Sequence, residues 1–372
     1  MNDYLFLSTS EPSPIMLERI NLAISLGYNP LYLNWNRNQF YQDVILEGKP
    51  FSKKTYDIGR VNNPGLRFLK IVKFIFWLKR ELRNSLKIGS ICYCDSFDLL
   101  FSILLINKEL KLEIRYGIED LHQNQLRTDI VGYLFRSLER VMLKRVNSLI
   151  LTSDQFWYQY YEKLGLRKYI VVENVPNEVH WYGFKRKINI NKFVIGFVGV
   201  IRYFKCLTSL VKAIRVLNNE GLNIEVKFSG NGEDLEKLKL FCIEDSFVKF
   251  TGTFNYDKDI RDIYSDIDLI YCVYDTSILN VRYAMATKFY ESIISKIPIL
   301  VSRETYLEER TIGAGIGGSV DVNDEVEMIN TLREAFLKKG WYDNAVKILS
   351  SSDELENYYY ISNRKSKYES IV

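Results

Sequence analysis

The sequence lacks several features that would assign it to a special class of protein. Fifty Lys and Arg against 46 Asp and Glu leave a formal net charge of only +4, which gives no indication of nucleic-acid binding. No apolar run reaches the roughly 18 residues that a membrane-spanning helix needs, and the N-terminus has no basic segment ahead of an apolar core, as a secretory signal would have. We therefore expect a cytoplasmic protein, either free or peripheral on the inner face of the cell membrane.

Cysteine is also scarce. The five cysteines are odd in number, and only Cys92 and Cys94 lie close together, so neither a disulfide framework nor a zinc site fits. Most of them sit in apolar, strand-like contexts, which indicates small buried hydrophobic side chains in a reducing compartment.

What is present indicates a folded chain of more than one domain. Hydrophobic residues make up 47% of the 372 residues, which excludes disorder, and roughly 150 residues per domain predicts two to three domains. Short apolar runs alternate with helix-period segments throughout, which predicts mostly parallel sheets covered on both faces. We expect an α/β protein with two Rossmann-like, doubly wound domains that face a cleft. Strands are predicted near 4–7, 30–35, 88–94, 112–116, 148–152, 169–172, 194–198, 224–229, 248–251, 269–273 and 299–302.

A change of pattern after Asn174 indicates the domain boundary. The segment VPNEVHWYGFKRKININK carries a proline and many polar and basic residues without a clear period. We predict a first domain at 1–178, a linker at 179–192, a second domain at 193–352, and a closing helix at 353–372 that returns toward the first domain.

Three short segments of the second domain suit a nucleotide ligand. In GFVGVIRYFK, glycines follow a strand and a helix begins near Lys205, so backbone amides, Arg202 and Lys205 could meet a diphosphate. In FSGNGEDLEKL, Gly230 lies in a turn into the next helix. Lys288 and Glu291 share one face of a later helix, where a carboxylate could accept two ribose hydroxyls. Each segment alone also fits a plain interpretation, namely a tight turn, solvated basic residues or a surface ion pair.

The order of these segments carries a resemblance. After the G-x-x-G turn with its Arg and Lys come a G-x-G turn, FTGTF, the aspartate-containing strand SDIDLIYCVYD, then NVRYAMATKFYE followed by IPILVS, and GAGIGGSVD. This arrangement resembles GT-B glycosyltransferases of the large family-4-like group, especially the bacterial surface-polysaccharide branch.

The resemblance implies roles for particular residues. Arg202 and Lys205 would bind the donor diphosphate, Glu291 would hold the ribose with support from Lys288, and the Gly230 turn and segment 253–256 would border the nucleobase. It also implies transfer with retention of configuration, with neither a metal nor a cofactor, since cations and a helix dipole can stabilise the leaving diphosphate. The residues expected to bind the donor are Gly199, Arg202, Lys205, Gly230, Thr253, Phe254, Lys288 and Glu291.

The sequence departs from the family pattern at four places, one of which is the arginine usually adjacent to the glycine, here displaced to Arg202. Tyr283 stands where a glutamate is expected, and Glu119 stands where many relatives have a histidine before Asp120. We expect Glu119 and Asp120 to face the sugar and acceptor, with His122 as a further candidate; the alternative is a helix N-terminus. The loop 8–14 lacks the family's glycines, so Ser13 is expected either to shape the acceptor pocket or to cap a helix ahead of Pro14. The expected catalytic residues are Glu119, Asp120, Lys205 and Glu291.

Two other segments allow a functional and a plain interpretation. Segment 65–87 carries seven cations interleaved with aromatic residues, so it could contact an anionic membrane or simply be a helix with one core face. Asp266 and Asp268 form an Asp-x-Asp, which could suggest the metal site of GT-A transferases. We interpret it as structural, because Asp268 opens an apolar strand.

We therefore expect a hexosyltransferase that moves a sugar from a nucleotide-sugar donor to a lipid-linked saccharide acceptor in capsule or O-antigen synthesis. A UDP-sugar 2-epimerase of the same fold and a non-catalytic nucleotide-binding partner are the alternatives.

Overall fold

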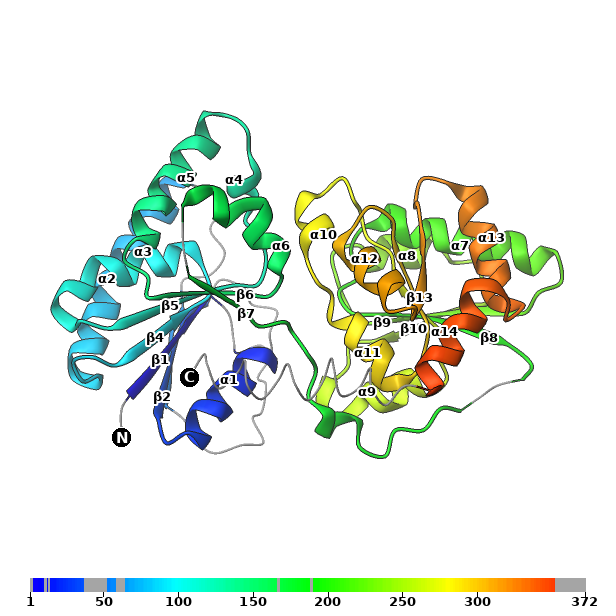
Figure 1. Cartoon of the computed structure of the whole chain (residues 1–372), viewed down its shortest axis with the longest axis horizontal. Coiled ribbons are helices and arrows are strands. Elements are labelled where there is room, and N and C mark those ends of the chain that lie inside the picture. Colours follow the sequence, from blue (N-terminus) through cyan, green and yellow to red (C-terminus); the bar gives the residue numbers. More distant parts are fainter. Residues whose placement is uncertain are drawn as a thin grey trace. The chain divides into compact units, whose positions relative to one another are not determined.

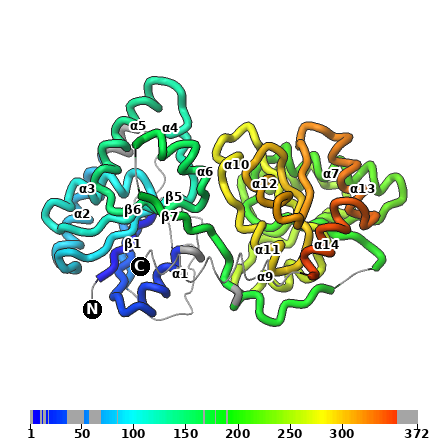
Figure 2. The backbone as a smooth tube through the Cα atoms, in the orientation of Figure 1, coloured from blue at the N-terminus to red at the C-terminus, as the bar shows by residue number. Residues whose placement is uncertain are grey.

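The chain forms two compact units that divide after Glu173. The computed structural model describes residues 3–9, 12, 14–36, 52–57, 64–165, 168–187 and 190–351. Each unit contains one parallel sheet with helices packed against it (Figure 1; Figure 2). The expected class of two Rossmann-like α/β domains is confirmed.

The first unit contains a seven-stranded parallel sheet of order β3-β2-β1-β4-β5-β6-β7. All six residues of β1 are buried, as a strand at the centre of a parallel sheet requires. Its strands are β1 (Asp3–Ser8), β2 (Asn29–Asn36), β3 (Ser52–Asp57), β4 (Ile91–Cys94), β5 (Glu113–Ile118), β6 (Ser148–Leu151) and β7 (Tyr169–Val171). Its helices are α1 (Pro14–Ser25), α2 (Pro64–Ser85), α3 (Phe97–Leu110), α4 (Gln123–Leu126), α5 (Ile130–Leu143), α6 (Asp154–Phe156), the π-helix η1 (Trp157–Tyr161) and the 3₁₀ helix η2 (Glu162–Leu164).

The second unit contains a six-stranded parallel sheet of order β10-β9-β8-β11-β12-β13. Its strands are β8 (Phe193–Val198), β9 (Ile224–Ser229), β10 (Val248–Gly252), β11 (Leu269–Cys272), β12 (Ile299–Ser302) and β13 (Gly317–Val320). Its helices are η3 (Glu178–Trp181), α7 (Phe204–Asn219), α8 (Leu235–Phe241), α9 (Tyr256–Ser265), α10 (Leu279–Tyr283), α11 (Thr287–Ser295), α12 (Tyr306–Gly313), α13 (Glu325–Phe336) and α14 (Gly340–Ser351). The strand order reverses between β8 and β11, and such a switch point is where open α/β sheets bind ligands.

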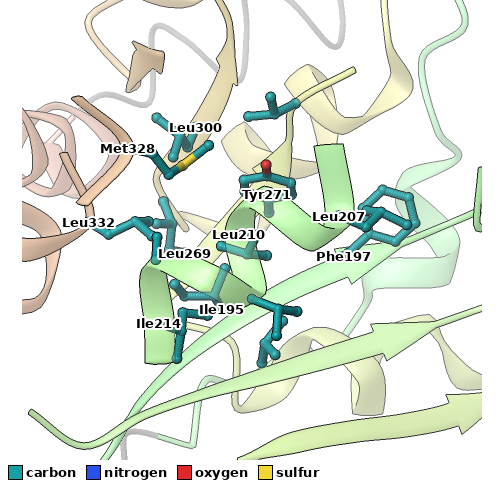
Figure 3. Packing of buried hydrophobic residues seen from close by; sticks show 14 of the residues in the cluster. Ile195, Phe197, Leu207, Leu210, Ile214, Leu269, Tyr271, Leu300, Met328 and Leu332 are labelled. Atoms are coloured by element: carbon teal, nitrogen blue, oxygen red, sulfur yellow. The ribbon is translucent and has the colours of Figure 1, made fainter. Parts of the chain in front are cut away.

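Helix α7 closes one face of the second sheet. Leu207, Leu210 and Ile214 recur at helical spacing and are fully buried with Ile195 of β8 and Leu269 of β11 (Figure 3). This packing fixes the start of α7 beside the end of β8, so the turn between them has a defined position.

The chain divides after Glu173, next to the change of pattern at Asn174, whereas the first domain was predicted to extend to residue 178. The segment expected as a linker at 179–192 begins with part of η3, and Trp181 is only 4% exposed in the core of the second unit. Its ring lies 5.1 Å from the ring of Tyr264. Burial of this aromatic side chain explains why 174–187 packs with the second unit rather than linking the two. The predicted closing helix at 353–372 lies outside the described residues.

A buried carboxyl group joins three elements of the first unit. Glu139 of α5 has no exposed surface. Its Oε1 accepts hydrogen bonds from Gln125 Nε2 at 2.7 Å and from the Tyr161 hydroxyl at 3.4 Å, and its Oε2 accepts one from the Tyr160 hydroxyl. Burial raises the pKa of Glu139 to about 7, although these hydrogen bonds act in the opposite direction.

This shift predicts a pH dependence of stability. Because the folded pKa lies above the unfolded value of about 4.5, the protonated form favours folding, and stability falls as the pH rises from about 4.5 through 7. The full change amounts to about 3 kcal/mol. Glu139→Gln cannot ionise, so its free energy of unfolding should rise relative to the wild type between pH 5 and pH 8. Urea unfolding of both proteins at the two pH values measures this difference, and a constant difference would contradict the prediction.

Candidate functional site

Two glycine turns meet at the carboxyl ends of β8 and β9, beside the switch point of the second sheet. Gly199 follows β8 with φ +141° and Gly230 follows β9 with φ +138°, a region that L side chains rarely adopt. The Gly199 amide donates to the Ser229 carbonyl at 2.8 Å, and a Cβ added to Gly230 would lie 1.8 Å from the Gly199 carbonyl oxygen. Both turns therefore require glycine, and the structure brings together the two glycines that the sequence singled out.

Helix α11 places a cation beside this turn. A Cβ added to Gly199 would lie 3.8 Å from Lys288 Nζ, and Nζ itself lies 3.4 Å from Glu291 Oε2. Glu291 is fully buried, while the side chain of Lys288 retains 17% exposure. The predicted proximity of Lys288 and Glu291 on one helix face is thus observed, and the pair faces the turn after β8.

Two tyrosines of α9 complete the surroundings of Glu291. The Tyr256 hydroxyl donates to Oε1 at 2.8 Å, and the Tyr264 hydroxyl donates to Oε2. Burial and the neighbouring carboxylate raise the pKa of Tyr264 well above its usual value, so this hydroxyl keeps its proton. Each carboxylate oxygen accepts one tyrosine hydrogen bond in this structure, and a ribose hydroxyl that binds Oε1 would either join the Tyr256 hydroxyl there or replace it.

The segment expected to border a nucleobase ends at that same tyrosine. Thr253 is exposed and Phe254 is half-buried against the core of the second unit, both between β10 and α9. The hydrogen bond from Tyr256 to Glu291 therefore connects two parts of the site that the sequence analysis had proposed separately.

The predicted diphosphate-binding cations lie at the start of α7. Lys205 is exposed, and its Nζ donates to Asn323 Oδ1 at 2.5 Å. The Arg202 guanidinium lies 4.9 Å above the ring centre of Tyr203. The Phe204 amide at the beginning of the helix donates to Asp234 Oδ2 at 3.0 Å, so this first amide already has an acceptor.

A cavity of about 360 Å³ adjoins Lys205 at the carboxyl ends of β11, β12 and β13. Sequence reasoning missed most of the polar residues that line it, although several directly follow strand ends, a position that could have indicated them. Arg282 lies 3.6 Å from Glu304 as an ion pair and directly precedes Tyr283, the departure from the family pattern. The charged residues lining the cavity are Lys205, Asp275, Arg282, Arg303, Glu304 and Asp321.

The first unit carries a second polar cluster at the ends of its central strands. Glu119 follows β5, and its Oε1 lies 3.8 Å from Nη1 of Arg19, which is only 2% exposed. Arg19 also donates to the Tyr93 hydroxyl. A Cβ on Gly117 would lie 1.8 Å from that hydroxyl, so the glycine makes room for Tyr93.

Asp95, directly after β4, belongs to the same cluster. Burial, followed by the charge of Glu119, raises the pKa of Asp95 to about 7, whereas a hydrogen bond from Ser8 lowers it. Burial likewise raises the pKa of Glu119. The sequence predicted Glu119 here but missed Arg19 and Asp95, which come from elements far apart in the chain.

The other residues predicted for the first domain fall into different settings. Asp120 is exposed. His122 caps α4, since its Nδ1 accepts from the Asn124 amide at 3.1 Å while its own amide donates to Gln125 Oε1 at 2.6 Å. Ser13 lies outside the described residues.

Both aspartates of the Asp-x-Asp have structural partners. Asp266 binds Lys227 Nζ at 2.6 Å, and Asp268 accepts from the Val194 amide at 2.9 Å and from Arg186 at 3.2 Å. Within the described part of the chain, no group of three or more His, Cys, Asp or Glu side chains could hold a metal ion. All five cysteines are buried and free, as expected.

The basic segment 65–87 contains α2, which packs its apolar side into the first unit. Phe74, Leu78 and Leu82 are fully buried, and Lys79 and Arg83 pair with Glu109 of α3 at 2.5 and 2.7 Å. Membrane contact through this segment stays a prediction. None of the helices in the described ranges is long and apolar enough to cross a bilayer.

Comparison with known proteins bears on the second unit and on the fold. Residues 181–348 match the family described as Glycosyl transferases group 1. The succinoglycan biosynthesis protein ExoL of Rhizobium meliloti is 24% identical over 251 residues, which span 63% of this chain and 60% of that relative.

Two solved structures resemble nearly the whole chain. HepE from Anabaena, in complex with UDP and glucose, aligns with a TM-score of 0.72 at 13% identity over 100% of this chain and 99% of its own. Sucrose-phosphate synthase from Thermosynechococcus elongatus aligns with a TM-score of 0.70 at 12% identity over 94% of each chain. At these identities the likeness shows the fold. The resemblance expected from the motifs is therefore confirmed: residues 181–348 match the group 1 glycosyl transferase family, and the chain has the GT-B fold.

Proposed function

We propose that this protein is a glycosyltransferase that transfers a hexosyl group from a nucleotide-sugar donor to a hydroxyl of a growing, lipid-linked surface glycan on the cytoplasmic side of the membrane. The observation that carries the proposal is the Lys288–Glu291 pair beside the Gly199 turn, within a group 1 glycosyl transferase domain. The HepE structure holds UDP and glucose, which supports a nucleotide-sugar donor. The relative ExoL is a succinoglycan biosynthesis protein, which supports a role in polysaccharide synthesis.

The second unit would bind the donor. As the sugar–oxygen bond breaks, the leaving nucleoside diphosphate gains negative charge, which Lys205, Arg202 and the N-terminal dipole of α7 can stabilise. Lys288 adds a further cation beside the Gly199 turn. These groups can carry out the transfer without a metal ion, and we propose retention of configuration on the family resemblance alone.

The first unit would hold the acceptor hydroxyl. Glu119 retains 34% side-chain exposure, so a ligand can reach it, while its ion pair with the buried Arg19 fixes its position. Asp95 Oδ1 is buried without a hydrogen-bond partner, and a carboxyl group of raised pKa can accept or return a proton near neutral pH. The cluster therefore suits the binding and deprotonation of a sugar hydroxyl.

A nucleotide panel followed by a transfer assay tests the proposal. One of UDP, GDP, dTDP and CMP, or its sugar, should raise the melting temperature, since a ligand at 100 times its Kd adds about 2.7 kcal/mol of stability. The same donor should then glycosylate a lipid-linked saccharide, and Glu119→Gln should abolish transfer while nucleotide binding persists.

Three outcomes would contradict the proposal. If no nucleotide of the panel raised the melting temperature, the proposed donor site would be contradicted. Interconversion of a UDP-sugar without acceptor would identify a 2-epimerase. Nucleotide binding without turnover on any acceptor of this class would favour a non-catalytic partner, for which Tyr283 at the glutamate position is the supporting observation.

A further inference from the structure

Helix α5 presents an apolar face to solvent. Six of its hydrophobic side chains are between 44% and 69% exposed, and their helical positions form one continuous arc over about three turns. Monomeric proteins seldom expose such a continuous patch without a binding partner. The residues of this α5 apolar face are Ile130, Val131, Tyr133, Leu134, Leu138 and Val141.

The opposite side of α5 accounts for the stability of the helix. Gly132, Glu139, Met142 and Leu143 are buried there, and the Phe135 ring stacks on Phe97 of α3 at 4.1 Å. The helix is therefore held by its inner side, and the outer apolar residues are not needed for its packing.

The charges around the α5 apolar face are almost all positive. Arg140, Lys144 and Arg145 are exposed at its C-terminal half. Of the two acids of this stretch, Asp129 pairs with Arg127, and Glu139 lies buried on the inner side of the helix, where it accepts hydrogen bonds from Gln125 and Tyr160. A single convex apolar helix bordered by cations is complementary to a flat, anionic lipid surface, where the exposed Tyr133 would lie at headgroup level.

We propose that the α5 apolar face is the membrane-docking surface of this protein and inserts into the interface of an anionic bilayer. It is a stronger candidate than segment 65–87, because α2 exposes Leu69 and Phe76 but pairs Lys79 and Arg83 with Glu109. The inference deepens the proposed function, because a lipid-anchored acceptor would be met at a membrane surface. It is tested without donor or acceptor, so its failure and the failure of glycosyl transfer are distinguishable.

Vesicle flotation of the full chain tests the proposal. Two types of vesicle are compared, neutral ones of phosphatidylcholine alone and anionic ones of phosphatidylcholine with phosphatidylglycerol, and the wild type should float with the anionic type. Leu134→Glu combined with Leu138→Glu should weaken this binding at least about tenfold, since burying each leucine is worth about 1.5–3 kcal/mol. Lys144→Gln with Arg145→Gln should weaken it by about fivefold per charge, and only on the anionic vesicles. Phe76→Glu on α2 is the matched control and should float like the wild type.

All substituted side chains are exposed, so unchanged melting temperatures will show that the variants fold. The proposal is overturned if the wild type binds neither type of vesicle, or if the leucine double variant binds as well as the wild type. A wild-type dimer in sedimentation that the leucine double variant dissociates, with vesicle binding unaffected, would instead assign the face to a second copy of the chain.

Discussion

Lys205→Ala should lower kcat/KM for glycosyl transfer at least about hundredfold, the usual effect of removing one group that stabilises charge in a transition state. The side chain is exposed at the start of α7 and reaches Asn323, so its removal leaves the core intact. The loss should appear mainly in kcat, because the negative charge on the diphosphate grows as the sugar leaves. Steady-state kinetics with the donor found in the nucleotide panel measures this effect.

Lys212 provides the matched control for this prediction. It lies on the same helix, is exposed, and pairs with Glu325 at 3.5 Å away from the cavity. Lys212→Ala should leave kcat/KM unchanged, while Lys205→Arg should retain part of the activity because it keeps the charge. If Lys205→Ala matched the wild type, the lysine would not stabilise the diphosphate.

The proximity of the residues proposed to bind the donor could be predicted from the sequence, because they lie in short, ordered segments. Gly199, Gly230 and the Lys288–Glu291 pair each follow a strand or share one helix turn, and parallel strands bring their carboxyl ends to one edge of the sheet. The contacts of Glu291 could not be predicted. Tyr256 and Tyr264 belong to another helix, and their distances to α11 depend on tertiary packing.

The polar cluster of the first unit, where we propose that the acceptor binds, shows the same limit more strongly. Arg19 and Glu119 are 3.8 Å apart in space but lie on α1 and after β5, and no local pattern relates them. The strand β3 was also missed, since SKKTYD is polar and mostly exposed, as an edge strand can be. The burial of Trp181 could not be predicted either, because proline and basic residues dominate the segment around it.

Glu291→Ala should destabilise the second unit by about 3–5 kcal/mol, because it leaves a cation and two tyrosine hydroxyls without their shared acceptor. Urea unfolding measures this loss. Glu291→Gln keeps the volume and part of the hydrogen bonding, so it should fold, yet lose most of its affinity for the nucleotide if the carboxylate holds the ribose.

Tyr256→Phe separates the two roles of Glu291. It removes only the hydroxyl that occupies Oε1, at a cost of about 1 kcal/mol in stability. If a ribose hydroxyl replaces Tyr256 on this oxygen, the variant should bind nucleotide at least as tightly as the wild type, because that replacement no longer breaks a hydrogen bond. Calorimetric titration of Tyr256→Phe and Glu291→Gln with the same nucleotide compares them directly. Unchanged affinity in Glu291→Gln would make Glu291 an anchor for α9 alone, because a carboxylate that holds the ribose cannot lose its charge without a loss of binding.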